Sequence, residues 1–154
     1  MESTRIVYLL RPYLKNISKR TIKSPKIYFT DTALARFIAG QRGPLHKHTS
    51  PFGRAVEGFV VNELFKQVEY LGLGWKLSYF RTKTGLEADV IISAPQGKIA
   101  AEIKATDKLA PKDIKGIQSL MAMDKDIKSG VVFSLQARPI SFGPRISNFP
   151  IWNL

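Results

Sequence analysis

The chain contains no cysteine, no long hydrophobic run and only 12 acidic residues. The absence of cysteine excludes disulfide bonds and thiolate metal sites, and it fits a reducing compartment, so we expect a cytoplasmic protein. Apolar runs such as IVYLL are too short to cross a bilayer, and the first residues lack the pattern of a signal peptide. We therefore expect no membrane span and no membrane partner.

Basic residues dominate the charge of the chain. There are 24 lysine and arginine residues among 154, and the net charge is +12. A chain this basic is expected to meet a polyanion, most simply nucleic acid, with DNA as the expected partner. The excess is greatest in residues 1–48, with ten basic and two acidic residues, whereas seven of the acids lie in residues 49–110. The alternative interpretation is a basic, soluble surface without a specific partner.

The pattern of apolar residues predicts an ordered series of helices and strands from residue 53 onwards. Apolar residues recur at steps of three and four in an amphipathic helix, and they alternate in a half-buried strand. The expected elements are a helix at 53–71, strands at 76–82, 87–94 and 98–105, a helix at 111–125 and a strand at 130–135. This order predicts an α/β or α+β fold with a mixed sheet.

The residues before position 49 are interpreted as a separate basic extension. It is expected to hold two short strands at 5–14 and 26–30, a polar connector, and a helix at 32–40 capped by Thr30 or Asp31. His46 and His48 lie in the following loop, where no third metal ligand is nearby. The apolar tail at 149–154 is expected at the sheet edge or over one face. We therefore divide the chain into residues 1–48 and 49–154.

Charged residues lie inside two of the expected strands, where such groups are uncommon. Side chains two positions apart share a face of a strand, so Glu102 and Lys104 point to the same side. The preceding turn is short, so Asp89 on the strand before is expected to meet Glu102. Two converging carboxylates share a proton or hold a cation, and Mg²⁺ or Mn²⁺ suits oxygen ligands. The alternative interpretation is a salt bridge between Lys104 and Asp89 or Glu102 on a solvated face.

Glu57 adds a third carboxylate from the helix at 53–71. At about 100° per residue it falls within the apolar stripe beside Leu64, whereas Asn62 and Lys66 fall on the opposite side. A carboxylate in a buried stripe needs a partner, which here is a lysine, a backbone amide or the same metal ion. The alternative is a buried pair with an arginine. A helix that packs its apolar stripe on the sheet would direct Glu57 towards the strands.

This combination resembles the PD-(D/E)XK nuclease superfamily. That superfamily has an αβββαβ core, a strand aspartate, a (D/E)-x-K motif on the next strand, and often a glutamate from the first helix. Asp89, Glu102, Lys104 and Glu57 match these positions. Ala88 stands where the literal motif has proline, which does not alter the set of ligands. The resemblance implies a restriction-endonuclease-like fold with a mixed central sheet.

A narrower resemblance covers nearly the whole chain. The stretches KSPKIYFTDTAL, GRAVEGFVVNEL, YFRTKTGLEADVII and AEIKA resemble, in order, the C-terminal domain of unknown function of bacterial and archaeal AAA-type ATPases. The segment YLLRPYLKNISKRTIKSPK is similar to the part that precedes this domain. No GxxxxGK[ST] loop occurs in the sequence, so we expect the ATPase module to be missing from this chain.

The resemblance implies a Mg²⁺- or Mn²⁺-dependent phosphodiesterase that cuts DNA. Asp89 and Glu102 would hold the ion, with the backbone carbonyl of Ile103 and the carboxylate of Glu57 as further ligands, while Lys104 would orient water or stabilise the transition state. The alternative function is a non-catalytic nucleic-acid-binding or protein-interaction module of the ATPase. Glu87 is expected to be a charge partner of Arg81 or Lys83. The residues expected to contact phosphate are Arg81, Lys83, Lys19, Arg20, Lys23 and Lys26.

Overall fold

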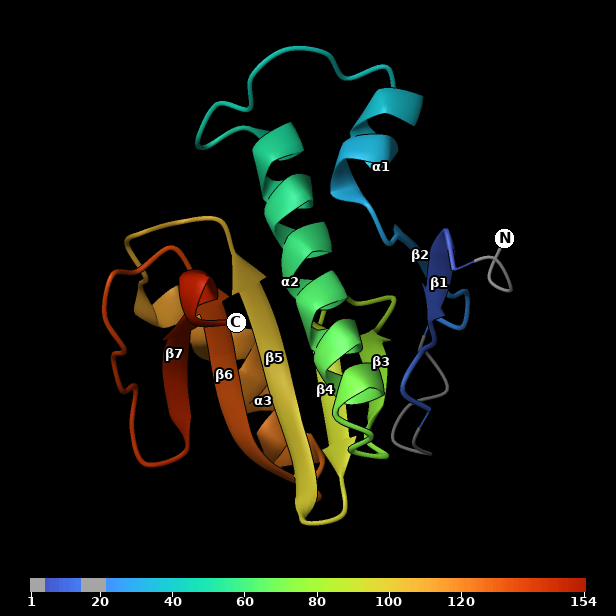
Figure 1. Ribbon diagram of the computed structural model, residues 1–154. Coiled ribbons are helices and arrows are strands. Elements are labelled where there is room, and N and C mark those ends of the chain that lie inside the picture. The colour runs from blue at the N-terminus through green and yellow to red at the C-terminus, as the bar shows by residue number, and fades with distance from the viewer. Residues whose placement is uncertain (1–4, 15–21) are drawn as a thin grey trace.

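A mixed five-stranded β-sheet forms the centre of the computed structural model, which describes residues 5–14 and 22–154 (Figure 1). The strands lie in the order β3-β4-β5-β6-β7. Neighbours among β3, β4 and β5 are antiparallel, whereas β6 runs parallel to β5 and β7 parallel to β6. The strand bounds are Lys76–Arg81 for β3, Glu87–Ala94 for β4, Gly97–Lys104 for β5, Ile127–Ser134 for β6 and Ile146–Pro150 for β7.

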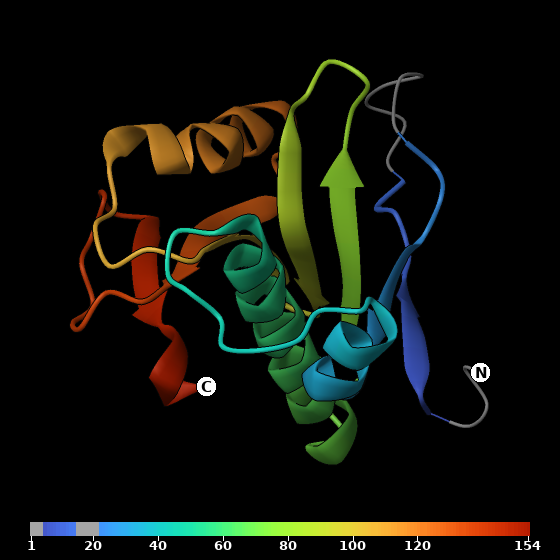
Figure 2. The same ribbon diagram turned by 90° about the horizontal axis from the view of Figure 1, so that it is seen from above.

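Helices cover both faces of this sheet (Figure 2). Helix α2 (Ser50–Tyr70) lies on one face, and α3 (Lys115–Met123), preceded by the 3-10 turn η1 (Pro111–Ile114), lies on the other. The hydroxyl of Thr49 accepts a hydrogen bond from the N–H of Phe52 at 3.4 Å and so caps α2. Pro51 suits the first turn because the missing N–H would have no partner there. The arrangement confirms the expected α+β class with a mixed sheet.

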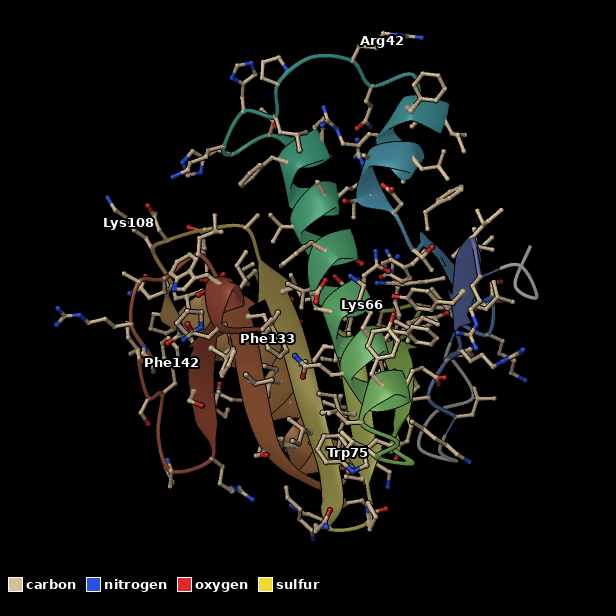
Figure 3. All side chains as sticks on the ribbon, in the orientation of Figure 1. Arg42, Lys66, Trp75, Lys108, Phe133 and Phe142 are labelled. Carbon is tan, nitrogen blue, oxygen red and sulfur yellow. The ribbon has the colours of Figure 1, made fainter. Side chains whose placement is uncertain are left out.

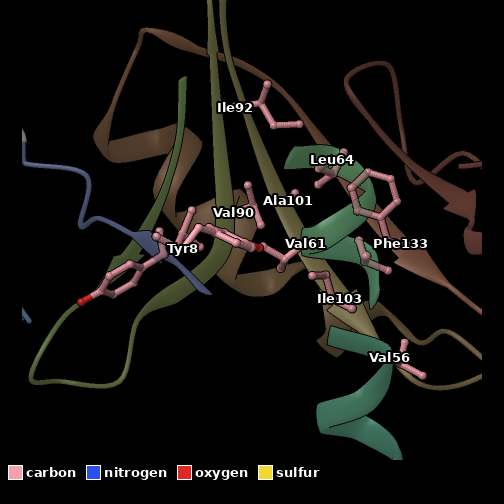
Figure 4. Packing of buried hydrophobic residues seen from close by; sticks show 12 residues of the cluster. Tyr8, Val56, Val61, Leu64, Val90, Ile92, Ala101, Ile103 and Phe133 are labelled. Carbon is pink, nitrogen blue, oxygen red and sulfur yellow. The ribbon is translucent and has the colours of Figure 1, made fainter. Parts of the chain in front are cut away.

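The larger apolar core lies between α2 and the sheet (Figure 4). Buried residues alternate along β5, so Ala101 and Ile103 pack towards α2, whereas Ala100 packs in the second core beneath α3. Glu102 lies between Ala101 and Ile103 in the strand and therefore points away from α2. The residues that α2 contributes are Val56, Val60, Val61 and Leu64.

The smaller core lies between α3 and the sheet. Ile117 and Leu120 of α3 are fully buried there, with Ile91 of β4 and Val132 of β6. α3 approaches β6 closely because Gly130 has no side chain, and a Cβ at that position would overlap Cγ2 of Ile117. The start of α3 lies against the beginning of β4, because a Cβ at Gly116 would lie 3.0 Å from the carbonyl oxygen of Glu87.

The N-terminal segment packs against α2 and the β3 edge of the sheet (Figures 1 and 2). Strands β1 (Val7–Leu10) and β2 (Lys26–Phe29) pair antiparallel, and Tyr8 and Leu10 are buried in the core shared with α2. The N–H of Tyr13 donates to the carbonyl of Tyr79 at 2.6 Å, and the N–H of Tyr79 donates to the carbonyl of Arg11 at 3.0 Å. The segment is therefore hydrogen-bonded to β3 as well as packed on it.

Helix α1 (Thr32–Ile38) follows β2 directly and lies beside the first half of α2. Asp31 caps it, because its Oδ1 accepts hydrogen bonds from the N–H groups of Ala33 and Leu34. This confirms one of the two expected caps. Within the described ranges, no helix is long and apolar enough to cross a membrane.

The structure differs from the sequence-based expectation most clearly at β6, at β7 and at Asn62. β6 begins at Ile127 rather than at residue 130, and β7 is a fifth strand that the apolar pattern did not predict. Phe149 and Pro150 of the expected edge segment form the end of β7, which lies at the sheet edge as expected. Asn62 is buried, although the helical wheel placed it on the side away from the core. Its Nδ2 donates to the carbonyl of Phe29 at 2.9 Å, because β2 covers that side of α2.

Candidate functional site

The candidate site lies where β4 begins and β5 ends, at one end of the inner strands of the sheet (Figure 1). The register of β3 and β4 shifts here: Ser78 pairs with Ile91 but Phe80 pairs with Ala88, so β4 has one extra residue. This bulge falls at Asp89 and Val90. A bulge bends the strand and redirects a side chain, which is why it is common beside functional sites.

Asp89 also closes the gap where β4 and β5 separate. Backbone pairing of the two strands ends at Val90 and Ala101. Beyond that point the Oδ2 of Asp89 accepts a hydrogen bond from the N–H of Ile103 at 2.8 Å. The carboxylate thus takes the place of a backbone acceptor and is held at a fixed position on the sheet. The structure brings the N–H of Ile103 to Asp89, whereas its carbonyl as a metal ligand stays a prediction.

Glu57 and Asp89 share one lysine, Lys26 of β2. The Nζ of Lys26 lies 3.1 Å from Oε1 of Glu57 and 3.7 Å from Oδ1 of Asp89. The hydroxyl of Tyr28, also on β2, donates to the same Oε1 of Glu57 at 2.5 Å. All three charged side chains are at most 31% exposed. Glu57 therefore points towards the sheet as expected, and its partner is a lysine, one of the alternatives open from the sequence.

Glu102 forms a second charged pair with Lys104. The Nζ of Lys104 lies 2.7 Å from Oε1 of Glu102, which confirms that the two side chains share a face of β5. The other carboxylate oxygen, Oε2, is buried and has no hydrogen-bond partner among the described residues. The Glu102 side chain is 10% exposed, while that of Lys104 is 33% exposed. Lys104 thus reaches solvent, and Glu102 presents an unsatisfied buried acceptor.

The carboxyl groups of Glu102 and Asp89 hold protons more tightly than ordinary carboxyl groups. Burial, and then the charge of Asp89, raise the pKa of Glu102 to about 7, although Lys104 acts in the opposite direction. Burial and the charge of Glu57 raise the pKa of Asp89 against the hydrogen bond from Ile103. Glu102 and Asp89 therefore interact electrostatically across the gap between β4 and β5.

The basic groups of the cluster stay protonated at neutral pH. Burial acts to lower the pKa of Lys26, but the charges of Glu57 and Asp89 outweigh it and raise the pKa overall. The pKa of Lys104 is raised in the same way, against burial, by Glu102. Burial and the charge of Glu57 raise the pKa of Tyr28 far above its usual value, so its hydroxyl remains a donor.

The residues expected to contact phosphate lie in three different settings. Arg81 pairs with Glu87 at 3.4 Å across β3 and β4, which confirms a basic partner for Glu87, and Lys83 is exposed in the following turn. Lys23 is exposed. It lies near Arg81, because the N–H of the preceding residue, Ile22, donates to the carbonyl of Arg81 at 2.9 Å. Lys26 lies within the carboxylate cluster. The predictions for Lys19 and Arg20 lie outside the described residues.

Sequence reasoning did not find the role of β2 in the site. Tyr28 was not considered, and Lys26 was expected to lie on a phosphate-binding surface rather than between two carboxylates. Lys26 and Tyr28 alternate with Ile27, which is 64% exposed, so their side chains share the inward face of β2. The alternation in the sequence could have shown that Lys26 and Tyr28 share a face of the strand. It could not have shown which element that face packs against.

The donor chemistry of the cluster fits a hard divalent cation. Glu102 offers a buried oxygen without a partner, and Asp89 and Glu57 offer further carboxylate oxygens. Oxygen ligands of this kind suit Mg²⁺ and Mn²⁺. Within the part of the chain that the structure describes, no three acidic or histidine side chains already converge as metal ligands. The ammonium group of Lys26 lies between Glu57 and Asp89, in the place of a cation.

The part of the chain that holds the carboxylates matches a known family model. The model described as Domain of unknown function (DUF4143) covers residues 52–154. The chain belongs to this family. A second model, Domain of unknown function (DUF8612), matches residues 1–44. The DUF4143 segment supplies Glu57, Asp89, Glu102 and Lys104, whereas Lys26 and Tyr28 come from the segment matched by the second model.

Two curated relatives of this DUF4143 protein are known from mycobacteria. One uncharacterized protein from Mycobacterium bovis and one from Mycobacterium tuberculosis are each 34% identical to it over 102 residues. The aligned segment covers 66% of this chain and 22% of each relative, so the match spans about a fifth of the relatives' length. No solved structure matches the chain significantly.

Proposed function

We propose that this chain is a metal-dependent nuclease-like domain that hydrolyses phosphodiester bonds in DNA. The observation that carries the proposal is the buried, unpartnered Oε2 of Glu102 beside Asp89 and Lys104 at the gap between β4 and β5. The element order αβββαβ and the origin of these residues on successive strands agree with the PD-(D/E)XK resemblance. The link to AAA-type ATPases belongs to the same proposal.

Asp89 and Glu102 are the residues that would hold Mg²⁺ or Mn²⁺. Asp89 is fixed by the N–H of Ile103, and the carbonyl of Ile103 is a further candidate ligand. A divalent ion bound there would supply an activated water and neutralise charge on the phosphate. In hydrolysis the water loses a proton and its oxygen bonds to phosphorus, while the bond from phosphorus to the leaving oxygen breaks and the leaving oxygen takes up a proton.

The lysines of the site have separate roles in this proposal. Lys104 is partly exposed beside Glu102 and would stabilise the negative charge that develops on the phosphate oxygens. Lys26 holds Glu57 and Asp89 together when no substrate is present. Tyr28 fixes the orientation of the Glu57 carboxylate through its hydrogen bond, which limits the positions that carboxylate can take.

Basic residues near the same end of the sheet support a nucleic-acid substrate. Arg81, Lys83 and Lys23 gather at the end of β3, and the whole chain carries a net charge of +12. Contacts between such groups and the phosphate backbone are sensitive to salt and indifferent to base sequence. We therefore propose that the domain binds DNA through its backbone rather than by reading bases.

The alternative function is a non-catalytic nucleic-acid-binding or protein-interaction module of an ATPase. One observation favours it: Lys26 and Lys104 already neutralise most of the negative charge of Glu57, Asp89 and Glu102. A site balanced in this way is stable without a metal ion. The two functions make opposite predictions for the effect of metal on DNA.

The deciding experiment is a cleavage assay with the purified chain. Supercoiled, linear and single-stranded DNA would be incubated with Mg²⁺, Mn²⁺ or EDTA. We expect cleavage in metal, none in EDTA, and losses of at least about a hundredfold for Glu102→Ala and Lys104→Ala. Matched controls are Glu69→Ala, an exposed glutamate of α2, and Lys98→Ala, a lysine of β5 away from the site.

The result is interpretable only if the variants fold. Circular dichroism and thermal unfolding would establish that each variant keeps the native fold. Calorimetric titration with Mn²⁺ gives an independent readout, and Glu102→Ala is expected to abolish the binding heat. DNA binding without cleavage in any metal, together with no Mn²⁺ binding, would reject the nuclease and leave the accessory module.

A further inference from the structure

A cleft beside the carboxylate cluster is not used by the proposed chemistry. It has a volume of about 430 Å³ and lies between β2, α1 and the first half of α2. Lys26 and Glu57 line it as well as belonging to the cluster, so the cleft is continuous with the candidate site. Side chains with nitrogen and oxygen atoms project into the space between α1 and α2 (Figure 3).

The cleft has an excess of positive charge. Its charged lining residues are Lys26, Arg36, Arg54 and Glu57, and the single carboxylate already binds Lys26 and Tyr28. Among the described residues, neither arginine has an acidic partner: Arg36 Nη2 donates to the carbonyl of Gly43, and Arg54 Nη1 donates to the hydroxyl of Ser50, each at 2.6 Å. The two guanidinium charges are therefore not neutralised in the described structure.

Arg36 carries a donor that the fold leaves unsatisfied. Its Nε is buried and has no hydrogen-bond partner within residues 5–14 and 22–154. A buried unpaired donor costs free energy, and such groups are uncommon unless a ligand or water completes them. An oxyanion bound in the cleft would complete it, because a guanidinium binds phosphate oxygens in a planar, paired geometry.

We propose that this cleft is a phosphate-binding subsite, in which Arg36 and Arg54 hold a backbone phosphate of a nucleic-acid strand. The inference rests on the proposed function, because the strand would run from the cleft past Glu57 to Asp89 and Glu102. Apolar side chains such as Ile27, Phe29 and Ala39 also line the cleft and suit the sugar groups between phosphates. The subsite positions the strand and takes no part in bond breaking.

The test is a DNA-binding measurement that does not depend on cleavage. Fluorescence anisotropy with a fluorescein-labelled 20-base-pair duplex would be recorded in EDTA over a range of salt concentrations. The variant is the double substitution Arg36→Gln with Arg54→Gln. The matched control is Lys76→Gln with Lys125→Gln, which removes two exposed charges at the opposite end of the sheet.

We expect the arginine pair to matter far more than the lysine pair. Loss of two phosphate contacts reduces the slope of log K against log salt by about 2 and weakens binding at 0.1 M salt by about tenfold or more. Inorganic pyrophosphate is expected to compete with the duplex on the unsubstituted protein and to lose that effect on the arginine variant. Calorimetric binding of pyrophosphate by a protein that does not bind the duplex would assign the cleft to a free phosphate ligand and overturn the proposal.

A charge-conserving variant separates a lost phosphate contact from a local structural change. Arg36→Lys keeps the positive charge, so it is expected to retain most of the salt dependence of duplex binding. An arginine double variant that binds the duplex like the lysine control would overturn the inference, even if the protein cleaves DNA. Failure to cleave in any metal, with the binding loss intact, would reject the nuclease and leave the subsite in place.

Discussion

At the scale of single residues, Lys26 occupies the position between two carboxylates where a metal ion would bind. The ammonium of Lys26 lies within 3.7 Å of carboxylate oxygens of both Glu57 and Asp89. A cation already in that place lowers the electrostatic gain from adding a second one. We therefore expect Lys26 to weaken the binding of Mg²⁺ or Mn²⁺ to the proposed site.

Replacement of Lys26 by methionine tests this competition. In EDTA at pH 8 we expect a loss of about 1–2 kcal/mol in the free energy of unfolding, because two half-buried carboxylates lose their partner. Mn²⁺ is expected to raise the melting temperature of the variant more than that of the unsubstituted protein, since binding to the native state stabilises it. The control is Lys98→Met, which removes a lysine 3.1 Å from Asp126 at the other end of β5. Equal Mn²⁺ shifts in both variants would contradict the prediction.

The raised pKa of Glu102 predicts how the free energy of unfolding depends on pH in the absence of metal. Its pKa is raised from 4.5 to about 7, so the folded state binds this proton more tightly than the unfolded chain. Stability therefore falls as pH rises between about 4.5 and 7. Glu102→Gln removes this contribution, and in EDTA it should be more stable than the unsubstituted protein at pH 8 by up to about 3 kcal/mol, with the difference vanishing near pH 4.

Urea unfolding at a series of pH values would measure the effect of Glu102→Gln. Some slope is expected to remain, because the pKa of Asp89 is also raised. Glu69→Gln, at an exposed position of α2, serves as the control and should leave the whole curve unchanged. The quantity to compare is the unfolding free energy of Glu102→Gln minus that of the unsubstituted protein. If this difference is lower at pH 8 than at pH 5, the fold favours the ionised form of Glu102 and the prediction is wrong.

At the scale of elements, the alternation of side chains between the two faces of a strand predicts the side-chain positions of β5 better than those of β4. β5 is regular near its end, so the shared face of Glu102 and Lys104 follows from spacing alone. β4 contains the bulge at Asp89, and a bulge leaves no clear mark in one sequence. The neighbouring position of Asp89 and Glu102 was predictable from the short turn, but the hydrogen bond from Ile103 to Asp89 was not.

Helix α3 is held against β6 by the absence of a side chain at Gly130. Gly130→Ala places a methyl group into Ile117 and is expected to cost about 1–3 kcal/mol of unfolding free energy. Gly53 in α2 is the matched control, because a methyl group there would meet no atom within 4 Å. Gly53→Ala is expected to stabilise the protein by about 0.5–1 kcal/mol through helix propensity. Similar effects of the two substitutions on chemical unfolding would contradict the packing of α3.

For the whole molecule, the sequence predicted the elements better than their long-range contacts. The order of helices and strands from residue 53 follows from periodicity, and the fold class follows from that order. Periodicity could not show that β2 packs on α2, since Lys26 and Glu57 are 31 residues apart. For the same reason the helical wheel misplaced Asn62, which β2 covers. Contacts of this kind depend on tertiary packing, which one sequence does not record.

The division into residues 1–48 and 49–154 stays a prediction, and truncation tests it. Leu10 is 2% exposed and shares one core with Val60 and Ile103, so a chain that starts at residue 49 would expose the side of α2 that β1 and β2 cover. Each large apolar side chain lost from a core costs about 2–5 kcal/mol, against a total stability of about 5–15 kcal/mol. We therefore expect the fragment 49–154 to unfold without a cooperative transition, or at a much lower temperature than the full chain.

Two substitutions in the full chain separate packing from chain length in this experiment. Leu10→Ala should lower the melting temperature substantially, whereas Ile27→Ala, at a position 64% exposed, should leave it nearly unchanged. A fragment 49–154 that melts like the full chain would make the first 48 residues an appendage. Because Lys26 and Tyr28 come from that segment, the same fragment would also present Glu57 and Asp89 without their partners from β2. A stable fragment with tighter Mn²⁺ binding than the full chain would then show that the N-terminal segment controls the charge of the site without being needed for the fold.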